Sequence, residues 1–401
     1  MRCTAVVTYS GVPRCRRHST RIIVAAAALL CCCLPTHAGY LGYRLFSLDH
    51  TKAGTADSTN FTVLLSGTYA EFATTANGGK VHNTVACGIY SIICPADLIF
   101  ASDAFCKTPL TGWEFEQYTA SSGQMLVWVI VPTLSHTVNT SIYACAGNSS
   151  VTTFQGGSLG AAFDTNTKAV YHLFAQNDSA SGGNNLNPIN SPVQAAGEID
   201  GAAQFNGTNQ YAQASAFTWT GTSPVTVSFW NYVASSDVQV SWAFDVGNTA
   251  GTDAHRFSAS VPWSDSILYW DYGANTNGAT GRVTTSYSSY LSAWTEVTLV
   301  STGSGNTFQA IYLNGALAAS AATSAASTVT GDLYIAAYPN ATFYGPPYEK
   351  GKIDEFRIAN VVRSASWILA EYNNQSSPST FASVGAFTPV NFVTEPQGFV
   401  F

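Results

Sequence analysis

The segment Ile311-Tyr312-Leu313-Asn314-Gly315 indicates the fold class, because it joins an apolar extended run to one specific kind of turn. An Asn-Gly pair after such a run predicts a two-residue type I′ hairpin, since both central residues of that turn need positive φ. Two antiparallel strands are therefore expected on either side of Asn314 and Gly315.

Short aromatic-rich runs continue on both sides of this hairpin, and Gly, Asn and Ser turns separate them. Strands at such spacing are typical of a β-sandwich. The composition agrees, because 46% of the residues are apolar, only 10% are charged, and the 20 Tyr and 22 Phe suit strands. The expected strands are Thr226–Trp230, Ser241–Phe244, Ile267–Tyr272, Thr295–Val300, Phe308–Leu313, Asp332–Ala336 and Lys352–Ile358.

The first half of the chain predicts a second, smaller β-sandwich. At 401 residues the chain exceeds the usual size of one hydrophobic core, so two domains are expected, with a glycine-containing junction at 151–165. Pro132 is expected to end a strand, because proline cannot donate to a ladder. The expected strands are Phe61–Leu65, Asp97–Phe100, Trp113–Tyr118, Met125–Val131 and Ser141–Cys145, and the expected domains are 39–152 and 165–385, followed by a tail at 386–401.

Residues 1–38 have the pattern of a secretory signal peptide. A cluster of Arg precedes the apolar run Ile22–Leu34, and Pro35 and Thr36-His37-Ala38 follow, with small residues at the cleavage positions. The run has about 13 residues, fewer than the roughly 20 of a spanning helix, and an uncleaved membrane anchor is the alternative. We expect the mature chain to be secreted or periplasmic, with no transmembrane segment.

The charge of the chain argues against several classes of partner. Residues 1–38 contain five Arg and no acid, so the remainder holds 11 basic and 23 acidic residues, a net charge of −12. Such a charge disfavours nucleic acids and anionic membranes. Acidic side chains are also what a calcium site requires.

Five of the nine Cys lie in the leader, and the other four are Cys87, Cys94, Cys106 and Cys145. An even number fits an oxidising compartment. Three pairings are possible, and we favour Cys87–Cys94, which closes a local loop, together with Cys106–Cys145. A metal site is the rival interpretation, although neither a CxxC pair nor a nearby His supports it.

Several motifs follow one another in the second half of the chain: Gly201–Gly207 with Tyr211, Val227–Trp230, Trp294 before Val297–Val300, Tyr312–Gly315, Gly351–Ile358, Arg363-Ser364, Trp367-Ile368 and Glu371-Tyr372. In this order they resemble the laminin-G-like domains of the concanavalin A-like lectin/glucanase superfamily, over about 215 residues. The resemblance implies an all-β, jelly-roll β-sandwich that a short helix closes. Ser364 can act as the N-cap of that helix.

The first half carries other motifs, namely Tyr43-Arg44, Asn60–Leu64, Asp97–Phe100, Glu114–Tyr118, Leu126–Pro132 and Gly147-Asn148. They resemble domain-of-unknown-function family 2341 (DUF2341), which is usually found on exported multidomain proteins beside lectin-like sandwiches. The cysteines, and Ala144-Cys145-Ala146 where the family tends to have aromatic residues, depart from its pattern. A local disulfide is the simplest explanation.

The laminin-G-like resemblance implies a structural calcium ion near Asp354. The family's equivalent Asp often helps to bind the ion, and backbone carbonyls commonly supply other ligands. Calcium takes roughly six to eight oxygens. Asp178, in the early turn, and Gly207, in the Phe205-Asn206-Gly207 hairpin, are the expected partners of Asp354. The alternative is that Asp354 pairs with Lys352 or Arg357 or caps a loop.

Surface aromatic residues could form a sugar site, because they combine apolar area with a defined face. Along Ile267–Tyr272, alternation sends Trp270 and Tyr272 to one side and Tyr269 and Asp271 to the other. Burial in the core is the alternative for each aromatic residue. The candidates for stacking on a sugar are Trp242, Trp263, Trp270, Tyr272, Tyr338 and Tyr344, with Asp265, Asp271 and Asn340 as polar partners.

Catalysis has little support in the sequence. Concanavalin-like glycosidases need paired carboxylates on one strand, as Glu-x-Asp-x-x-Glu or Glu-x-Asp-x-Glu. The only Glu-x-Asp here is Glu198-Ile199-Asp200, and no second acid follows it. No GxSxG, HExxH or phosphate-loop motif occurs either. His172 fits a structural role better than that of a base.

We therefore expect an exported protein that is not an enzyme and that binds a glycan or an extracellular protein through its second domain. A structural module of the cell surface without a sugar site is one alternative. A glycan-active hydrolase or lyase is the other, and it would place two carboxylates about 5–10 Å apart in a groove.

Overall fold

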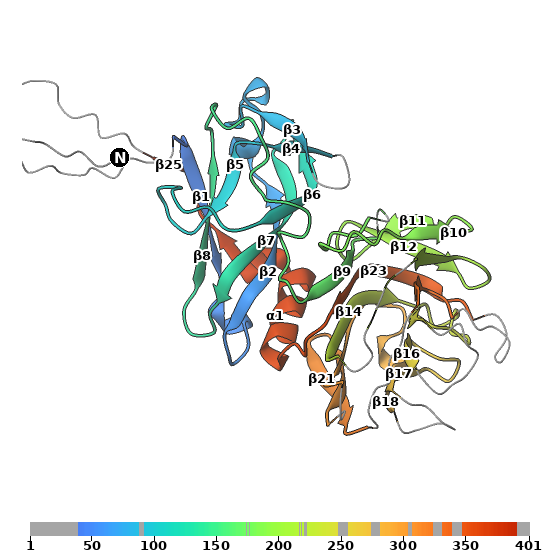
Figure 1. Ribbon diagram of the computed structural model, residues 1–401. Helices are drawn as coiled ribbons and strands as arrows, with labels where there is room; N and C mark the ends of the chain where they lie inside the picture. The colour runs from blue at the N-terminus through green and yellow to red at the C-terminus, as the bar shows by residue number, and fades with distance from the viewer. Residues whose placement is uncertain are drawn as a thin grey trace, which may run out of the picture. The chain divides into compact units, whose positions relative to one another are not determined.

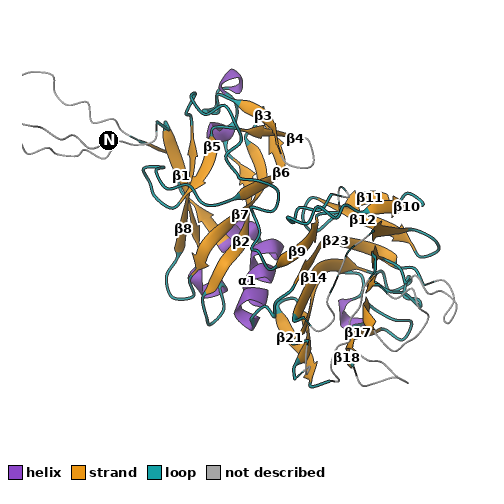
Figure 2. Ribbon diagram, viewed as in Figure 1, coloured by secondary structure: helices purple, strands orange, loops and turns teal. Residues whose placement is uncertain are grey.

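The computed structural model describes residues 39–87, 92–173, 175, 177–215, 217, 219, 223–247, 256–273, 281–303, 307–323, 331–338 and 347–390. They lie in one compact unit, and most of their regular structure is β-strand (Figure 1, Figure 2). The expected signal peptide and residues 391–401 of the expected tail lie outside the described residues. Among the described residues, no helix is long and apolar enough to cross a membrane.

The first sandwich consists of two antiparallel sheets around one apolar core. Its strands are β1 (Gly42–Leu48), β2 (Ser58–Thr68), β5 (Leu98–Ala101), β6 (Trp113–Thr119), β7 (Gln124–Leu134), β8 (Thr140–Ala146), β24 (Ala382–Val384) and β25 (Thr388–Pro389), beside the pair β3 (Thr84–Cys87) and β4 (Ile92–Pro95). One sheet has the order β24-β1-β8-β5, with β25 also paired to β1, and the other has the order β2-β7-β6. Phe46, Phe100 and Trp113 are among the side chains that fill the core.

Strand β7 continues through Pro132 to Leu134, so the prediction that Pro132 ends this strand is wrong. Val131 pairs with Phe61 of β2, and the pairing resumes beyond the proline. The residue of β2 next to Phe61 is Asn60, whose φ is 53°. The local bend at Asn60 lets the ladder pass the one position that lacks an N–H donor.

The end of the chain completes the first sandwich. Strand β24 pairs antiparallel with β1, which places Val384 opposite Phe46, and β25 pairs with the start of β1. Phe381 and Ala382 lie in the first core. Residues 381–389 therefore belong to the first sandwich, whereas the sequence motifs assigned them to the second domain and the tail. These strands cover a side of β1 that would otherwise be an open edge.

The second sandwich also has two antiparallel sheets. Its strands are β9 (Thr167–Tyr171), β10 (Asn187–Ile189), β11 (Val193–Ala196), β12 (Gly201–Asn206), β13 (Tyr211–Ala214), β14 (Val225–Tyr232), β15 (Phe244–Val246), β16 (Arg256–Ser260), β17 (Ile267–Gly273), β18 (Arg282–Ser286), β19 (Thr295–Ser301), β20 (Gln309–Leu313), β21 (Ala316–Ala321), β22 (Leu333–Ile335) and β23 (Lys350–Ala359). One sheet has the order β11-β12-β23-β14-β19-β20-β21, with β9 also on β23, and the facing sheet has the order β10-β13-β22-β15-β16-β17-β18. Phe229, Phe257 and Phe356 fill the space between them. The predicted all-β fold is confirmed.

Two local sequence signals are confirmed as well. Asn314 and Gly315, between β20 and β21, have φ values of 51° and 74°, as the Asn-Gly hairpin requires. Ser364 caps helix α1 (Ala365–Ser376), because its Oγ accepts a hydrogen bond from the Trp367 N–H at 3.1 Å. The other short helices are α2 (Pro378–Phe381) and the 3-10 turns η1 (His50–Lys52), η2 (Ala70–Phe72), η3 (Thr75–Asn77) and η4 (Ser288–Tyr290).

Helix α1 contacts both sandwiches. Ile368 packs with Val300 of the second sandwich, and Ala370 lies in the core of the first. Asn374 also binds β2, which lies beside α1 (Figure 1), because its side chain exchanges two hydrogen bonds of 2.7 and 2.9 Å with the Leu64 backbone. The helix that was expected to close the second domain therefore also anchors the first.

The cysteines form the two disulfides that the sequence favoured, Cys87–Cys94 and Cys106–Cys145. Their Cα atoms lie 5.7 and 6.1 Å apart, within the usual range for a disulfide. The second bridge ties the loop after β5 to β8 and spans 39 residues of sequence. The rival interpretation of a cysteine metal site is therefore wrong.

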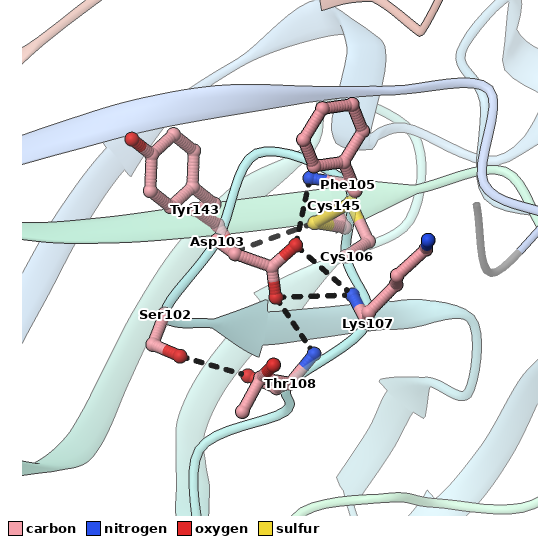
Figure 3. The surroundings of a disulfide bond; sticks show 8 residues. All are labelled: Ser102, Asp103, Phe105, Cys106, Lys107, Thr108, Tyr143 and Cys145. Carbon is pink, nitrogen blue, oxygen red and sulfur yellow. Dashed lines mark hydrogen bonds between the residues drawn. A yellow bond between two sulfur atoms is a disulfide. The ribbon is translucent and has the colours of Figure 1, made fainter. Parts of the chain in front are cut away.

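The loop that carries Cys106 is held by Asp103 (Figure 3). Its carboxylate accepts hydrogen bonds from the backbone N–H groups of Phe105 and Thr108 at 2.9 and 2.8 Å, and a longer one from Lys107. Burial alone would raise the pKa of Asp103, but these donors lower it. The ionised carboxylate thus orders the loop locally and presents Cys106 to Cys145.

Candidate functional site

Three of the predicted aromatic residues meet at the 7-stranded sheet of the second sandwich. Trp242 precedes β15, Trp263 follows β16, and Tyr338 follows β22. The Trp242 ring stacks on the Tyr338 ring at a centroid distance of 4.6 Å and meets the Trp263 ring edge-on at 4.8 Å. Trp242 and Tyr338 are buried, whereas Trp263 is half-buried, so Trp263 is the member that a ligand can reach most easily.

Trp242 and Trp263 line a cavity of about 170 Å³, which we call the aromatic cavity. Its other lining residues are Arg256, Ser260, Tyr269 and Arg282. Alternation along the strands explains why polar side chains lie on this face. On β16, Arg256 and Ser260 point away from the core that holds Phe257 and Ala259.

The wall of the cavity is charged. Both Arg256 and Arg282 bind Asp271, which is 3% exposed. The Arg282 guanidinium makes two hydrogen bonds to the Asp271 carboxylate, Nε–Oδ1 at 2.6 Å and Nη2–Oδ2 at 2.7 Å. Arg256 Nη1 lies 3.2 Å from Asp271 Oδ2. Burial would lower the pKa of Arg282, but Asp271 raises it.

Tyr269 forms the rim of the same cavity. The Arg282 guanidinium lies 4.7 Å from the centre of its ring, and its hydroxyl donates to Asp265 Oδ2 at 2.7 Å. This hydrogen bond is the main reason that the pKa of Tyr269 is raised. Both predicted polar partners that the structure describes, Asp265 and Asp271, therefore hold lining residues in place.

Two other predicted sugar-binding residues lie in the core. The side chains of Trp270 and Tyr272 are 0% and 1% exposed. Trp270 Nε1 donates to the Val300 carbonyl at 3.1 Å, and the Tyr272 hydroxyl donates to the Ser223 carbonyl at 2.8 Å. The prediction that Trp270 and Tyr272 stack on a sugar is wrong, because the outward face of β17 is the one that carries Tyr269. Tyr344 and Asn340 lie outside the described residues.

The sequence did not indicate Arg256, Ser260, Tyr269 or Arg282 as site residues. Tyr269 could have been found, since it alternates with Trp270 and only the direction of the core was unknown. Register brings the two arginines together, because Asp271 of β17 pairs with Arg282 of β18 and the next strand supplies Arg256. Nothing in the local sequence reports such cross-strand neighbours.

The predicted calcium ligands have different roles in the structure. Asp354 is buried, and its Oδ2 accepts a hydrogen bond from the Ile199 N–H at 2.9 Å. Both oxygens of Asp178 accept hydrogen bonds from backbone N–H groups, at 2.9 to 3.0 Å. The Gly207 carbonyl accepts one from Gln239 Nε2 at 2.8 Å. Asp354 thus binds the backbone of the loop at 197–200 through Oδ2, and of these three only Asp354 keeps a buried oxygen, Oδ1, without a partner among the described residues.

Glu116, His172 and Glu355 form the one group of three potential metal-ligating side chains among the described residues, with ligand atoms within 4.8 Å of one another. Glu116 lies on β6 of the first sandwich and Glu355 on β23 of the second. His172 Nδ1 lies 2.6 Å from Glu355 Oε1, and Glu355 Oε2 lies 2.7 Å from Arg357 Nη2. Trp128 Nε1 donates to Glu116 at 2.9 Å. We assign the group as a buried ionic network that links the sandwiches.

Burial and charge act in opposite directions within this network. Burial alone would lower the pKa of His172, but Glu355 and Glu116 raise it to about 9. Burial raises the pKa of Glu116 to about 8, although His172 opposes this. Burial would also raise the pKa of Glu355, but His172 and Arg357 lower it. His172 is therefore a cation at neutral pH, paired with an ionised Glu355, as a structural residue would be.

A second cavity, of about 280 Å³, lies in the first sandwich. Trp113, Phe115, Phe154 and Leu159 line it, and Glu114 is the single ionisable residue among the described residues of its wall. Glu114 is engaged, because its Oε1 accepts a hydrogen bond from Ser179 Oγ at 2.7 Å. This cavity offers apolar contact with little polar selection, whereas the aromatic cavity offers both.

Residues 206–369 match the family described as the concanavalin A-like lectin/glucanases superfamily. The match confirms the laminin-G-like domain that the motifs indicated. No curated protein matches the chain.

Three solved structures are similar over about half of the chain. The botulinum neurotoxin serotype G binding domain has 16% identity and a TM-score of 0.41, over 50% of this chain and 49% of that one. The binding domain of Paraclostridial Mosquitocidal Protein 1 has 16% identity and a TM-score of 0.40, over 52% of each chain. The third structure is Domain 4 of AbnA, a GH43 extracellular arabinanase from Geobacillus stearothermophilus, in complex with arabinotriose. It has 18% identity and a TM-score of 0.39, and the match covers 51% of this chain and 98% of that one. The chain thus spans about half the length of the two toxin domains, and no function is inferred from these three structures.

Proposed function

We propose, from the concanavalin A-like domain at residues 206–369, that the chain is an exported, non-catalytic protein that holds a sugar in the aromatic cavity. The observation that carries the proposal is the half-buried Trp263 beside the stacked rings of Trp242 and Tyr338. An aromatic face beside fixed polar groups suits a sugar ring, which has apolar C–H faces and polar edges.

The size of the cavity limits the ligand. Pockets for drug-sized ligands measure roughly 300–1,000 Å³, and the aromatic cavity has about 170 Å³. One sugar residue, such as the end of a glycan chain, therefore fits better than several consecutive residues. The hydroxyl groups of Ser260 and Tyr269 in the wall can hydrogen-bond to such a residue.

Binding without catalysis is supported by the state of the carboxylates at the cavity. Both oxygens of Asp271 accept hydrogen bonds from arginines. Asp265 accepts a hydrogen bond from the Tyr269 hydroxyl. A glycosidase needs two carboxyl groups that face the scissile bond, whereas these two are engaged by neighbouring side chains.

Export is supported by the two disulfides, which persist in oxidising compartments. The leader-like residues 1–38 and the resemblance of 39–152 to the exported DUF2341 family point the same way. The ligand would then be an extracellular glycan. A glycan on a protein surface would make the partner an extracellular protein.

A structural calcium ion at Asp354 belongs to the same proposal. The buried Asp354 Oδ1, which has no hydrogen-bond partner among the described residues, supports it. The oxygens of Asp178 and Gly207 are occupied and do not support it. Since a bound ion stabilises the folded state, excess chelator should lower the melting temperature, and an unchanged melting temperature would show that no ion is bound.

Substitution of the reachable tryptophan tests the sugar site. Trp263→Ala should weaken binding of a glycan ligand about tenfold or more in calorimetric titration, because it removes the exposed stacking face. Trp294→Ala is the matched control, since Trp294 is also half-buried but packs beside Tyr232 and Lys352. Equal loss in both variants, or no loss in Trp263→Ala, would place the ligand elsewhere.

A scaffold module without a sugar site is the second candidate, and the deep burial of Trp242 and Tyr338 favours it. A scaffold would bind no glycan, and Trp263→Ala would change nothing but the local packing.

A further inference from the structure

We infer that the aromatic cavity selects an acidic sugar, one that carries a carboxylate such as a uronic acid. The inference rests on the proposed function, because it names the ligand class of the same cavity. Its basis is Arg282, a cation in the cavity wall that binds Asp271 with only part of its N–H donors.

Asp271 holds the two arginines in place. It is 3% exposed and binds both guanidinium groups at 2.6 to 3.2 Å. An arginine held by a buried carboxylate is already oriented, so less side-chain entropy is lost when a ligand binds. Asp271 is in this sense a positioning residue.

Arg282 retains the capacity for a further anion. A guanidinium has five N–H donors, and Asp271 occupies two of those of Arg282. The Arg282 side chain keeps 22% of its surface exposed while it lines the cavity. Its guanidinium carbon lies over the Tyr269 ring, 4.7 Å from the ring centre.

The geometry of arginine favours a carboxylate among the possible anions. The planar fork of donors matches the two oxygens of a carboxylate in one plane. A uronic acid also presents an apolar ring face, which the half-buried Trp263 can contact. A volume of about 170 Å³ suits a flat carboxylate on one ring better than a bulkier sulfate ester. A sulfated sugar is therefore the alternative anion that the experiment must separate.

The nearby acid on the rim does not remove the preference. Asp265 is exposed, and its carboxylate accepts the Tyr269 hydroxyl. Water screens the charge of an exposed group much more strongly than that of a buried one. The Arg282 side chain is 22% exposed, so water screens its charge less than that of the exposed Asp265.

The test compares matched sugars on the full secreted chain. Oligomers of galacturonic acid, of galactose and of galactose sulfate, and the corresponding glucuronic acid and glucose pair, are titrated by calorimetry at low salt. We expect the uronate to bind at least roughly tenfold more tightly than its neutral counterpart, and more tightly than the sulfate, because charge-assisted hydrogen bonds add to binding. The preference should shrink as salt rises.

Variants then assign the preference to the arginine. Arg282→Gln should bring the uronate-to-neutral affinity ratio close to one, and Arg282→Lys should restore part of the preference. Arg44→Gln is the matched control, because Arg44 also pairs with a carboxylate, that of Glu71, and has 18% exposure. The comparison of sugars on the wild-type chain needs no variant, so it decides even where a variant fails to fold.

The outcomes separate this inference from the proposed function. Equal affinity for uronate and neutral sugar, or preference for the sulfate, would overturn the carboxylate preference and leave the sugar site standing. If no sugar bound to the wild-type chain or to Trp263→Ala, both the carboxylate preference and the proposed sugar site would be overturned. A uronate preference that survives Arg282→Gln would contradict the role assigned to Arg282.

Discussion

His172 Nδ1 lies 2.6 Å from Glu355 Oε1, and neither side chain is exposed to solvent. The same nitrogen lies 3.5 Å from Glu116 Oε2. One imidazolium therefore stands between a carboxylate of the second sandwich and a carboxyl group of the first. His172 and Arg357 together compensate the charge of Glu355 in a region that water does not reach.

We predict that His172→Ala lowers the free energy of unfolding by roughly 3–5 kcal/mol, because it removes one of the two cations that pair with the buried Glu355 carboxylate. Urea-induced unfolding checks the value. His50→Ala is the control, since His50 hydrogen-bonds to Asn139 at the surface and should change stability by no more than about 0.5 kcal/mol. Equal effects in the two variants would contradict the structural role of the network.

The stability of the fold should fall as the pH rises from about 5 to 8. Burial raises the pKa of Glu349 to about 7 and that of Glu296 to about 8. The unfolded chain loses these protons near pH 4.5, whereas the folded chain keeps them, so rising pH favours the unfolded state over this interval. Each pKa unit corresponds to about 1.4 kcal/mol, which gives an upper limit of roughly 3 kcal/mol for Glu349.

Glu349→Gln should flatten this pH profile, as measured by urea unfolding at pH 5, 6.5 and 8. The amide keeps the carbonyl oxygen that can accept the 3.0 Å hydrogen bond from Asn231, and it has no proton to lose. Glu71→Gln is the comparison, because Arg44 lowers the pKa of Glu71 and this acid is ionised throughout the interval. A stability that increases from pH 5 to pH 8 would contradict the prediction.

The two disulfides should contribute unequally to stability. Cys106–Cys145 spans 39 residues and Cys87–Cys94 spans 7. A longer loop loses more entropy in the unfolded chain when it is closed. Replacing Cys106 and Cys145 by Ser should cost about 2–5 kcal/mol, and replacing the other pair less; thermal unfolding of the two double variants measures both. The reverse order would show that the loop model does not apply.

Local sequence signals predicted the parts of the fold that local geometry determines. The Asn314-Gly315 hairpin and the Ser364 cap depend on neighbouring residues, and both are confirmed. The pairing of Val384 with Phe46 joins residues from opposite ends of the chain. No local pattern encodes such a partner, so the sequence assigned residues 381–385 to the second domain and 386–389 to the tail.

The candidate site was predicted in part for a similar reason. Alternation along β17 separated Trp270 from Tyr269 correctly, but it does not state which face meets the core. The sequence predicted Trp242 and Trp263 separately as sugar-stacking candidates. Their contact with each other depends on tertiary packing. The arginine pair depends on the register of three strands, which only the assembled sheet defines.

A broad glycan array, probed with the chain in the presence and absence of chelator, tests the central claim most directly. The aromatic cavity predicts binding to at least one class of glycan, with Trp263→Ala losing that signal and Trp294→Ala keeping it. Absence of binding across the whole array, under both conditions, would contradict a sugar-binding role for this protein.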